Sequence, residues 1–252
     1  MSHASELPDD LVAALTRVAR VPRLLVTSDF DGTLAPIVNH PGDARPLAAA
    51  AGALRALAVL PATSAALISG RALADLAVLS GLGEPVHLVG SHGAEFDTGF
   101  THDIDSALLQ RICDELAAIA RRYPGVTVEP KPASVALHVR NADPDDGAAA
   151  LAAARAASSG WSAQLTAGKA VLEFAVIVTD KGEALDILRH RDEASAVVFF
   201  GDDVTDEKAF RRLRGDDVSV KVGPGETEAA YRISSPEDVA TALEFLVTAR
   251  RG

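Results

Sequence analysis

The sequence predicts an α/β fold in which a Rossmann-like parallel sheet is interrupted by a smaller α+β unit. Short apolar strands alternate with helical segments towards both ends of the chain, which is typical of a parallel sheet with helices on both faces. The middle of the chain instead runs helix, strand, strand, twice over. Two of the apolar strands also end in acidic residues, and α/β sheets bind ligands beyond the carboxyl ends of their strands.

Strands and helices alternate in the first part of the chain. Apolar runs predict the strands, and amphipathic segments flanked by Pro or Gly predict the helices. In chain order we expect a helix over 9–20, a strand beginning at Leu24, a helix over 46–60, a strand over 64–70, a helix over 71–80 and a strand over 86–90.

The middle of the chain has a different order of elements. Each of its two helices is followed by two strands that lie close together in the sequence, which favours antiparallel pairing. The expected elements are a helix over 106–123, strands over 126–130 and 135–140, a helix over 143–158, and strands over 162–166 and 170–176.

The alternation of strands and helices resumes after about Ile177. The expected elements are a helix over 181–191, a strand over 196–203, a helix from about Thr205, a strand over 218–223 and a helix over 236–249. Because the same pattern lies on both sides of the middle unit, we interpret that unit as an insertion. The predicted domains are residues 1–98 and 178–252 for the α/β core and 99–177 for the inserted cap.

Composition and charge exclude several classes of protein. The formal net charge is −11, which disfavours non-specific binding to nucleic acid or to anionic membranes. Cys113 is the only cysteine, so an intrachain disulfide and a thiolate zinc cluster are excluded. The sequence shows neither a secretory signal nor an apolar segment long enough to span a membrane. We therefore expect a cytoplasmic protein. We separately expect a monomer.

The strands beginning at Leu24 and at 196 both end in acidic residues. If these strands are neighbours, their acids converge on one spot, where two carboxylates about 4 Å apart repel by about 4 kcal/mol at an effective dielectric constant near 20. Such a site needs a cation, and oxygen ligands without His or Cys suit Mg²⁺. The alternative is that some of these acids, Asp203 and Asp206 in particular, are helix caps or solvated loop residues. The candidate metal ligands are Asp29, Asp31, Asp202, Asp203 and Asp206.

The spacing of the first two acids suits phosphoryl transfer. Residues two apart in an extended chain point the same way. Asp29 would attack phosphorus to form an aspartyl-phosphate, and Asp31 would protonate the leaving alcohol and then deprotonate the attacking water. Ser69 would donate a hydrogen bond to the phosphoryl oxygens, and Lys181 would neutralise the developing charge.

Four segments in this order resemble the motifs of the haloacid dehalogenase (HAD) superfamily of phosphohydrolases. They are "DFDGTL", "ISGR", "DKG" and "GDDVTDE". The resemblance implies a HAD core, and the position of the insertion between the second and third motifs is similar to the superfamily's C2-type cap. Asp31 matches an Asp that is typical of members that hydrolyse their intermediate, although mutases of the superfamily also have it.

The cap carries charged residues in an alternating pattern. In "VEPKPASVALHVR", Glu129 and Lys131 are expected to share a face of the first strand, and His138 and Arg140 are expected to share a face of the second. Glu173 lies among apolar neighbours in the last strand of the cap. Such groups suit a polyhydroxylated ligand, since carboxylates accept hydrogen bonds from sugar hydroxyls and Lys and Arg donate to them. The alternative is a solvated sheet face with surface ion pairs.

Together the core and cap patterns resemble the trehalose-6-phosphate phosphatase family over nearly the whole chain from about Leu24. The resemblance rests on the DxDGTL start, "SGR", "GSHGAEF", "GDDVTDE" and a set of matching cap positions. These cap positions are Glu129, Lys131, Ser134, His138, Arg140, Gly168, Lys169 and Glu173. Two details depart from the family pattern, an Asp in "DKG" where Asn is common and Val139 where Tyr is more usual.

The resemblance implies a Mg²⁺-dependent phosphoric monoester hydrolase that acts on trehalose 6-phosphate in trehalose biosynthesis. It implies further substrate-binding residues, which are Gly70, Arg71, His92, Glu129, Lys131, His138, Arg140 and Glu173. Because no synthase segment is present, a free-standing phosphatase is expected. Two alternatives are open: a phosphatase or phosphomutase for another sugar phosphate, such as mannosyl- or glucosyl-3-phosphoglycerate, and a non-catalytic sugar-phosphate sensor.

Overall fold

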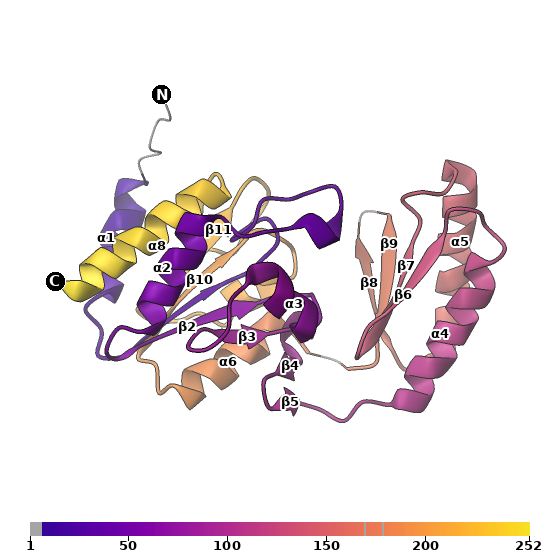
Figure 1. Cartoon of the computed structure of the whole chain (residues 1–252), viewed down its shortest axis with the longest axis horizontal. Helices are drawn as coiled ribbons and strands as arrows, with labels where there is room; N and C mark the ends of the chain where they lie inside the picture. Colours follow the sequence, from indigo (N-terminus) through magenta and orange to yellow (C-terminus); the bar gives the residue numbers. More distant parts are fainter. Residues whose placement is uncertain (1–6, 169, 178) are drawn as a thin grey trace. The chain divides into compact units, whose positions relative to one another are not determined.

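The chain folds into two compact units, shown in Figure 1. The computed structural model describes residues 7–168, 170–177 and 179–252. The core unit comprises Met1–Gly99 and Thr179–Gly252, and the inserted unit comprises Phe100–Val178. The expected return to the core at residue 178 falls outside the described residues. Among those described, no helix combines the length and the apolar character that a membrane span requires.

The core unit contains a six-stranded sheet in which all neighbouring strands run parallel. This confirms the predicted fold class. In spatial order the strands are β12 (Tyr231–Ile233), β11 (Val218–Val222), β10 (Ala196–Gly201), β1 (Leu24–Ser28), β2 (Thr63–Ile68) and β3 (His87–Val89). The strands beginning at Leu24 and at Ala196 are therefore direct neighbours, as the convergence of the acids requires.

Helices cover both faces of this sheet, which is why β1 is buried along its whole length. Leu24 and Val26 pack in one apolar cluster and Leu25 in another, because successive side chains point to opposite faces. The helices of the first cluster are α1 (Asp9–Val18), α2 (Ala48–Ala58), α3 (Leu73–Ser80) and α8 (Pro236–Arg251). The helices of the second cluster are α6 (Lys181–Arg191) and α7 (Asp206–Phe210).

Several short elements were not expected from the sequence. They are the edge strand β12, the hairpin of β4 (Glu95–Phe96) and β5 (Gly99–Phe100), and the single-turn helices η1 (Pro41–Asp43) and η2 (Ser91–Gly93). Each has three residues or fewer, which is too short for a hydrophobic period to show. The strand expected over 196–203 ends at Gly201, since Asp202 and Asp203 belong to the turn before α7.

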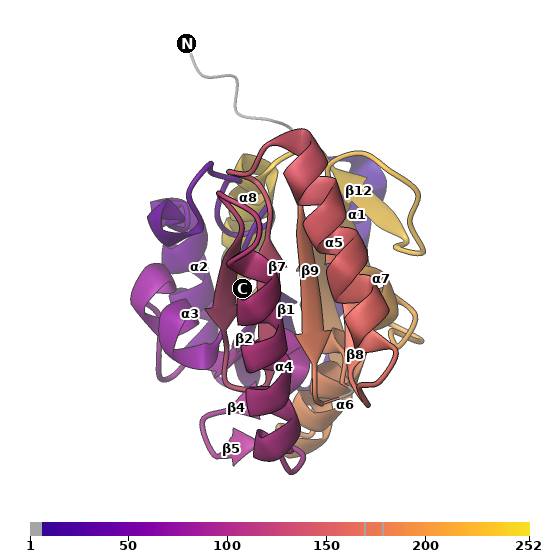
Figure 2. The ribbon, with the colours of Figure 1, turned by 90° about the vertical axis from the view of Figure 1, so that its right-hand side faces the viewer.

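The inserted unit is a four-stranded antiparallel sheet with two helices on one face. Figures 1 and 2 show the helices side by side over the strands. The strand order is β6 (Thr127–Pro130), β7 (Ser134–His138), β9 (Val171–Ala175) and β8 (Gln164–Gly168), and the helices are α4 (Ser106–Ala120) and α5 (Pro144–Ser158). Asp105 and Asp143 cap the two helices by accepting hydrogen bonds from backbone N–H groups in their first turns.

The two faces of this sheet differ in chemistry. Val135, Leu137, Leu172 and Phe174 point to the face covered by the helices and form its apolar cluster together with Trp161. The residues between them in each strand point the other way. The sheet therefore presents its second set of side chains on the face opposite its own helices.

Candidate active site

Asp29 lies where β1 ends, beside the end of β10. Its backbone N–H donates to the Phe200 carbonyl over 2.9 Å, so the ladder between the strands extends one residue past β1. The residue is only 4% exposed. Its carboxylate pairs with the Lys181 ammonium at 2.7 Å. The sequence-predicted nucleophile and its neutralising cation are therefore in direct contact.

Lys181 is placed by the start of α6. Asp180, the residue before it, caps this helix by accepting a hydrogen bond from the Glu183 N–H over 2.9 Å. Asp and Asn are both good capping residues, so the departure from the family's Asn at this position keeps the cap. Lys181 is buried and donates to Asp206 as well as pairing with Asp29.

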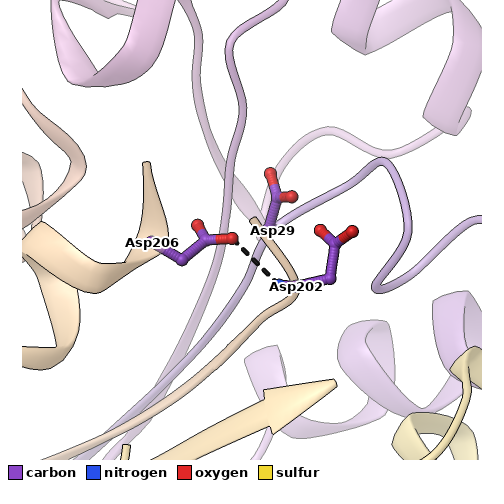
Figure 3. Close-up of side chains that lie close together, drawn as sticks. All are labelled: Asp29, Asp202 and Asp206. Atoms are coloured by element: carbon purple, nitrogen blue, oxygen red, sulfur yellow. Dashed lines mark hydrogen bonds between the residues drawn. The ribbon is translucent and has the colours of Figure 1, made fainter. Parts of the chain in front are cut away.

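Three carboxylates meet at this edge of the sheet. Figure 3 shows Asp29, Asp202 and Asp206 close together. Each offers a carboxylate oxygen that lies within 4.8 Å of the others. Asp206 accepts hydrogen bonds from the backbone N–H groups of Asp202 and Asp203, both over 2.9 Å. Its side chain is fully buried, so Asp206 is a part of the site rather than a solvated helix cap.

The electrostatics of the cluster favour a bound cation. Burial raises the pKa of Asp29 well above its ordinary value, against the opposing effect of Lys181. Burial and the nearby Asp206 raise the pKa of Asp202 to about 6. Burial alone would lower the pKa of Lys181, but Asp206 and Asp29 outweigh it and the net shift is upward. One ammonium among three carboxylates leaves excess negative charge, and oxygen donors of this kind fit a hard divalent cation.

Gly32 makes room for this arrangement. Its φ angle is +79°, a region that residues with a side chain rarely adopt. A Cβ atom here would lie 2.1 Å from a carboxylate oxygen of Asp202. The glycine of the DFDGTL segment thus allows both the turn after β1 and the close approach of Asp202.

Asp31 and Asp203 do not join the carboxylate cluster found among the described residues. Both oxygens of Asp31 accept hydrogen bonds from the Arg71 guanidinium at 2.7 Å, and the guanidinium lies over the Phe30 ring. Asp203 is exposed, and its carboxylate accepts a hydrogen bond from the Val204 N–H over 2.6 Å. This local turn matches the loop alternative considered for Asp203.

Two loops bring Ser69, Gly70 and His92 together. Ser69 is buried, and its hydroxyl accepts a hydrogen bond from the Arg71 N–H. The His92 N–H donates to the Ser69 carbonyl over 2.9 Å. A Cβ atom on Gly70 would lie 2.4 Å from the His92 ring, so only glycine allows this packing. Glu95 ties the loops further by accepting bonds from the Leu73 N–H and the Ser91 hydroxyl.

The inserted unit gathers polar groups on the face opposite its helices. Glu129 of β6 and Glu173 of β9 both pair in register with Ala136 of β7, so they share one row and one face. Lys131 and Ser134 donate to Glu173 over 3.1 and 2.6 Å.

The other expected residues of the cap lie at its strand ends or just beyond them. His138 and Glu129 are hydrogen-bonded at 2.7 Å. Lys131 and Arg140 lie just outside β6 and β7, and Arg140 is exposed. Lys169 lies outside the described residues.

Sequence reasoning missed one charged residue beside the site. Lys221 is buried in β11, and its ammonium donates to the backbone carbonyl of Asp202. The signal was available, because "VSVKV" places a single lysine in an otherwise apolar strand.

Comparisons with known proteins identify the family of this chain. A family model described as Trehalose-phosphatase matches residues 27–237. Trehalose-6-phosphate phosphatase of Escherichia coli (strain K12) is 36% identical over 88% of this chain and 85% of its own. Trehalose-phosphate phosphatase of Mycobacterium marinum is 36% identical over 94% of this chain, which spans 65% of that relative's length.

Solved structures show the same fold. The C-terminal domain of trehalose-6-phosphate phosphatase from C. albicans matches with a TM-score of 0.81 at 24% identity, over 98% of this chain and 99% of that one. A trehalose-6-phosphate phosphatase from Aspergillus fumigatus matches with a TM-score of 0.68 at 28% identity, over 94% and 97%. The chain therefore belongs to the trehalose-phosphatase family of HAD-type phosphatases.

Proposed function

We propose that this protein is a Mg²⁺-dependent phosphatase that hydrolyses trehalose 6-phosphate to trehalose and phosphate. The observation that carries the proposal is the buried Lys181 between Asp29 and Asp206, with Asp202 alongside. An acid at the end of a buried strand, next to a fixed cation and two further acids, suits attack on a phosphate ester. Membership of the family supports trehalose 6-phosphate as the substrate.

In the first chemical step, Asp29 attacks phosphorus. A bond forms between phosphorus and the Asp29 carboxylate, the bond from phosphorus to the sugar oxygen breaks, and Asp31 gives a proton to that oxygen. In the second step a water gives a proton to Asp31 and attacks the aspartyl-phosphate, which releases phosphate and restores Asp29. Lys181 and the Ser69 hydroxyl stabilise the charge on the phosphoryl oxygens.

A bound Mg²⁺ would supply further neutralisation of the phosphoryl group, and Asp29, Asp202 and Asp206 would hold it. Asp31 and Asp203 were also expected to be ligands. The Asp203 carboxylate instead accepts a hydrogen bond from the Val204 N–H within its own turn. Asp31 would act as the general acid and base rather than as a carboxylate ligand.

The pair between Arg71 and Asp31 bears on the first step. Both oxygens of Asp31 accept hydrogen bonds from the Arg71 guanidinium in this structure, so Arg71 occupies the edge of the carboxylate that reaches both oxygens at once. A substrate that draws the guanidinium away would leave this edge of the carboxylate open to the leaving oxygen. A phosphorylated sugar offers alternative acceptors for the guanidinium, which supports Arg71, together with Gly70 and His92, as substrate-binding residues.

The polar face of the inserted unit is proposed to select the sugar. Glu129, Lys131 and Glu173 would bind the distal glucose, and His138 and Arg140 would contribute further hydrogen bonds. The support is that one sheet face gathers carboxylates and donors in neighbouring strands. Such groups match the hydroxyls of a disaccharide.

A substrate panel with phosphate detection tests the proposal. Trehalose 6-phosphate, glucose 6-phosphate, mannosyl-3-phosphoglycerate and glucosyl-3-phosphoglycerate are compared with and without Mg²⁺. We expect phosphate release from trehalose 6-phosphate to exceed that from the others at least tenfold, and to need the metal. A preference for one of the glycerate derivatives would replace the proposed substrate, and absence of all turnover would favour a sensor.

A further inference from the structure

A second buried lysine lies beside the acidic loop that follows β10. Lys221 is 4% exposed and belongs to β11, whose residues are all buried. It pairs in register with Gly201, the residue that precedes Asp202. An apolar residue would fill this position at lower cost, because a buried ammonium loses its hydration. A buried lysine at this position is therefore expected to have specific polar partners.

Lys221 contacts two groups of the acidic segment that follows β10. Its ammonium donates a hydrogen bond to the backbone carbonyl oxygen of Asp202 and lies 4.0 Å from a carboxylate oxygen of Glu207. The backbone N–H of Asp202 is bonded in turn to Asp206 over 2.9 Å, drawn as the dashed line in Figure 3. Both main-chain polar groups of Asp202 are thus fixed by buried charged side chains.

We propose that Lys221 is a positioning residue for the metal site. By holding the carbonyl of Asp202, it fixes the peptide from which the Asp202 carboxylate extends toward Asp29 and Asp206. Within the part of the chain that the structure describes, Lys221 forms no hydrogen bond or ion pair with a carboxylate of the cluster. Its effect passes through the backbone of Asp202. The inference rests on the proposed function, since that function requires a cation at these acids.

Two effects of Lys221 on metal affinity have opposite signs. As a positive charge near the site, the ammonium repels a cation, so its removal would tighten binding. As a positioning group it preorganises a ligand, so its removal would weaken binding. Loss of residues that orient metal ligands typically costs about 10–100-fold in metal affinity. The direction of the change therefore separates the two roles.

The test is calorimetric titration of the folded protein with Mg²⁺ alone, for the wild type, Lys221→Met, Lys221→Gln and Lys208→Met. Lys221→Gln keeps an N–H donor without the charge and covers the case in which the methionine variant does not fold. Lys208→Met makes the same chemical change at an exposed position of α7. We expect Mg²⁺ affinity to fall about 10–100-fold in Lys221→Met, less in Lys221→Gln, and to change less than twofold in Lys208→Met.

Kinetics provide a second readout. The Mg²⁺ concentration for half-maximal turnover should rise with the measured loss of affinity, while KM for trehalose 6-phosphate at saturating Mg²⁺ stays within about threefold. A purely structural role would lower the melting temperature and leave the affinity of the folded protein unchanged, which would overturn the inference. Tighter Mg²⁺ binding in Lys221→Met would overturn it too. Absence of binding by the wild type would instead refute the proposed metal-dependent function.

Discussion

Replacement of Lys181 by methionine tests how the buried carboxylates are held together. The ammonium lies 2.7 Å from an oxygen of Asp29 and 2.7 Å from an oxygen of Asp206. At an effective dielectric constant near 20, each contact gives a gross attraction of about 6 kcal/mol, which the cost of burying the charges largely offsets. Removal of one partner from a buried ion pair costs about 3–5 kcal/mol, because the remaining charge is uncompensated. We expect Lys181→Met to lower the free energy of unfolding by this amount.

A double variant separates lost charge balance from lost packing. Lys181→Met combined with Asp206→Asn removes one carboxylate together with the ammonium, while the Asn oxygen can still accept a backbone N–H bond. Neighbouring groups of this kind couple by about 0.5–3 kcal/mol. The double variant should therefore be more stable than Lys181→Met alone. The measurement is urea unfolding in EDTA at pH 8, with Lys208→Met as the control for an exposed lysine.

The pH dependence gives the sharper check. Burial raises the pKa of Asp29 well above 3.8 and that of Asp202 to about 6. Between pH 3.8 and about 6 the folded state binds more protons than the unfolded state, so these two acids lower stability as pH rises through that window. Without the Lys181 ammonium both pKa values rise further. The loss of unfolding free energy in Lys181→Met, relative to the wild type, should therefore be larger at pH 8 than at pH 5. A loss that is equal at both pH values, or larger at pH 5, would refute the reasoning.

Four further predictions concern catalysis and metal binding. Asp29→Asn should lower kcat by about 10³-fold or more, the scale of losing a nucleophile, and near-normal turnover would remove Asp29 from that role. Glu129→Ala should raise KM for trehalose 6-phosphate and spare p-nitrophenyl phosphate, whereas equal losses on both would count against sugar recognition by the inserted unit. Mg²⁺ at 100 times its Kd at pH 7.5 should stabilise the protein by about 2.7 kcal/mol and raise Tm by about 5–10 °C. The same Mg²⁺ concentration should raise Tm less at pH 5, because the pKa of Asp202 is raised to about 6 and its protonated form binds the cation less well. Gly32→Ala should weaken Mg²⁺ binding at least tenfold, because its Cβ would displace the Asp202 carboxylate. Unchanged Mg²⁺ affinity in a titration would contradict this and would show that the loop can move to accommodate the methyl group.

The parallel sheet and its acidic edge could be predicted because they follow from periodicity and topology. Once "LLVTSDFD" and "AVVFFGDD" are read as neighbouring strands, the meeting of Asp29 with Asp202 is a geometric consequence. Lys181 followed from its place at a helix start, since Asp180 caps that helix. These inferences need only the direction of each strand and the position of each turn.

Side-chain partners across non-adjacent segments could not be predicted in the same way. The Arg71 guanidinium reaches Asp31, and Ser134 and Lys131 share Glu173, through contacts set by local backbone geometry rather than by spacing in the sequence. Asp202 and Asp203 are consecutive in the sequence, yet only Asp202 belongs to the carboxylate cluster found among the described residues. The turn after β10 directs Asp203 outward, and no periodic pattern covers such a short turn.

The central pair of the core sheet has a consequence for how the protein is made. The Thr27 hydroxyl of β1 donates to the Val198 carbonyl of β10, 171 positions further along the chain. During synthesis, β1 and the whole inserted unit are translated before β10, the partner of β1, exists. One edge of an apolar strand then lacks a partner, and long-range pairing is slow to form. The nascent chain is therefore most exposed to aggregation in this interval, and a chaperone bound at that stage should raise the yield of folded protein.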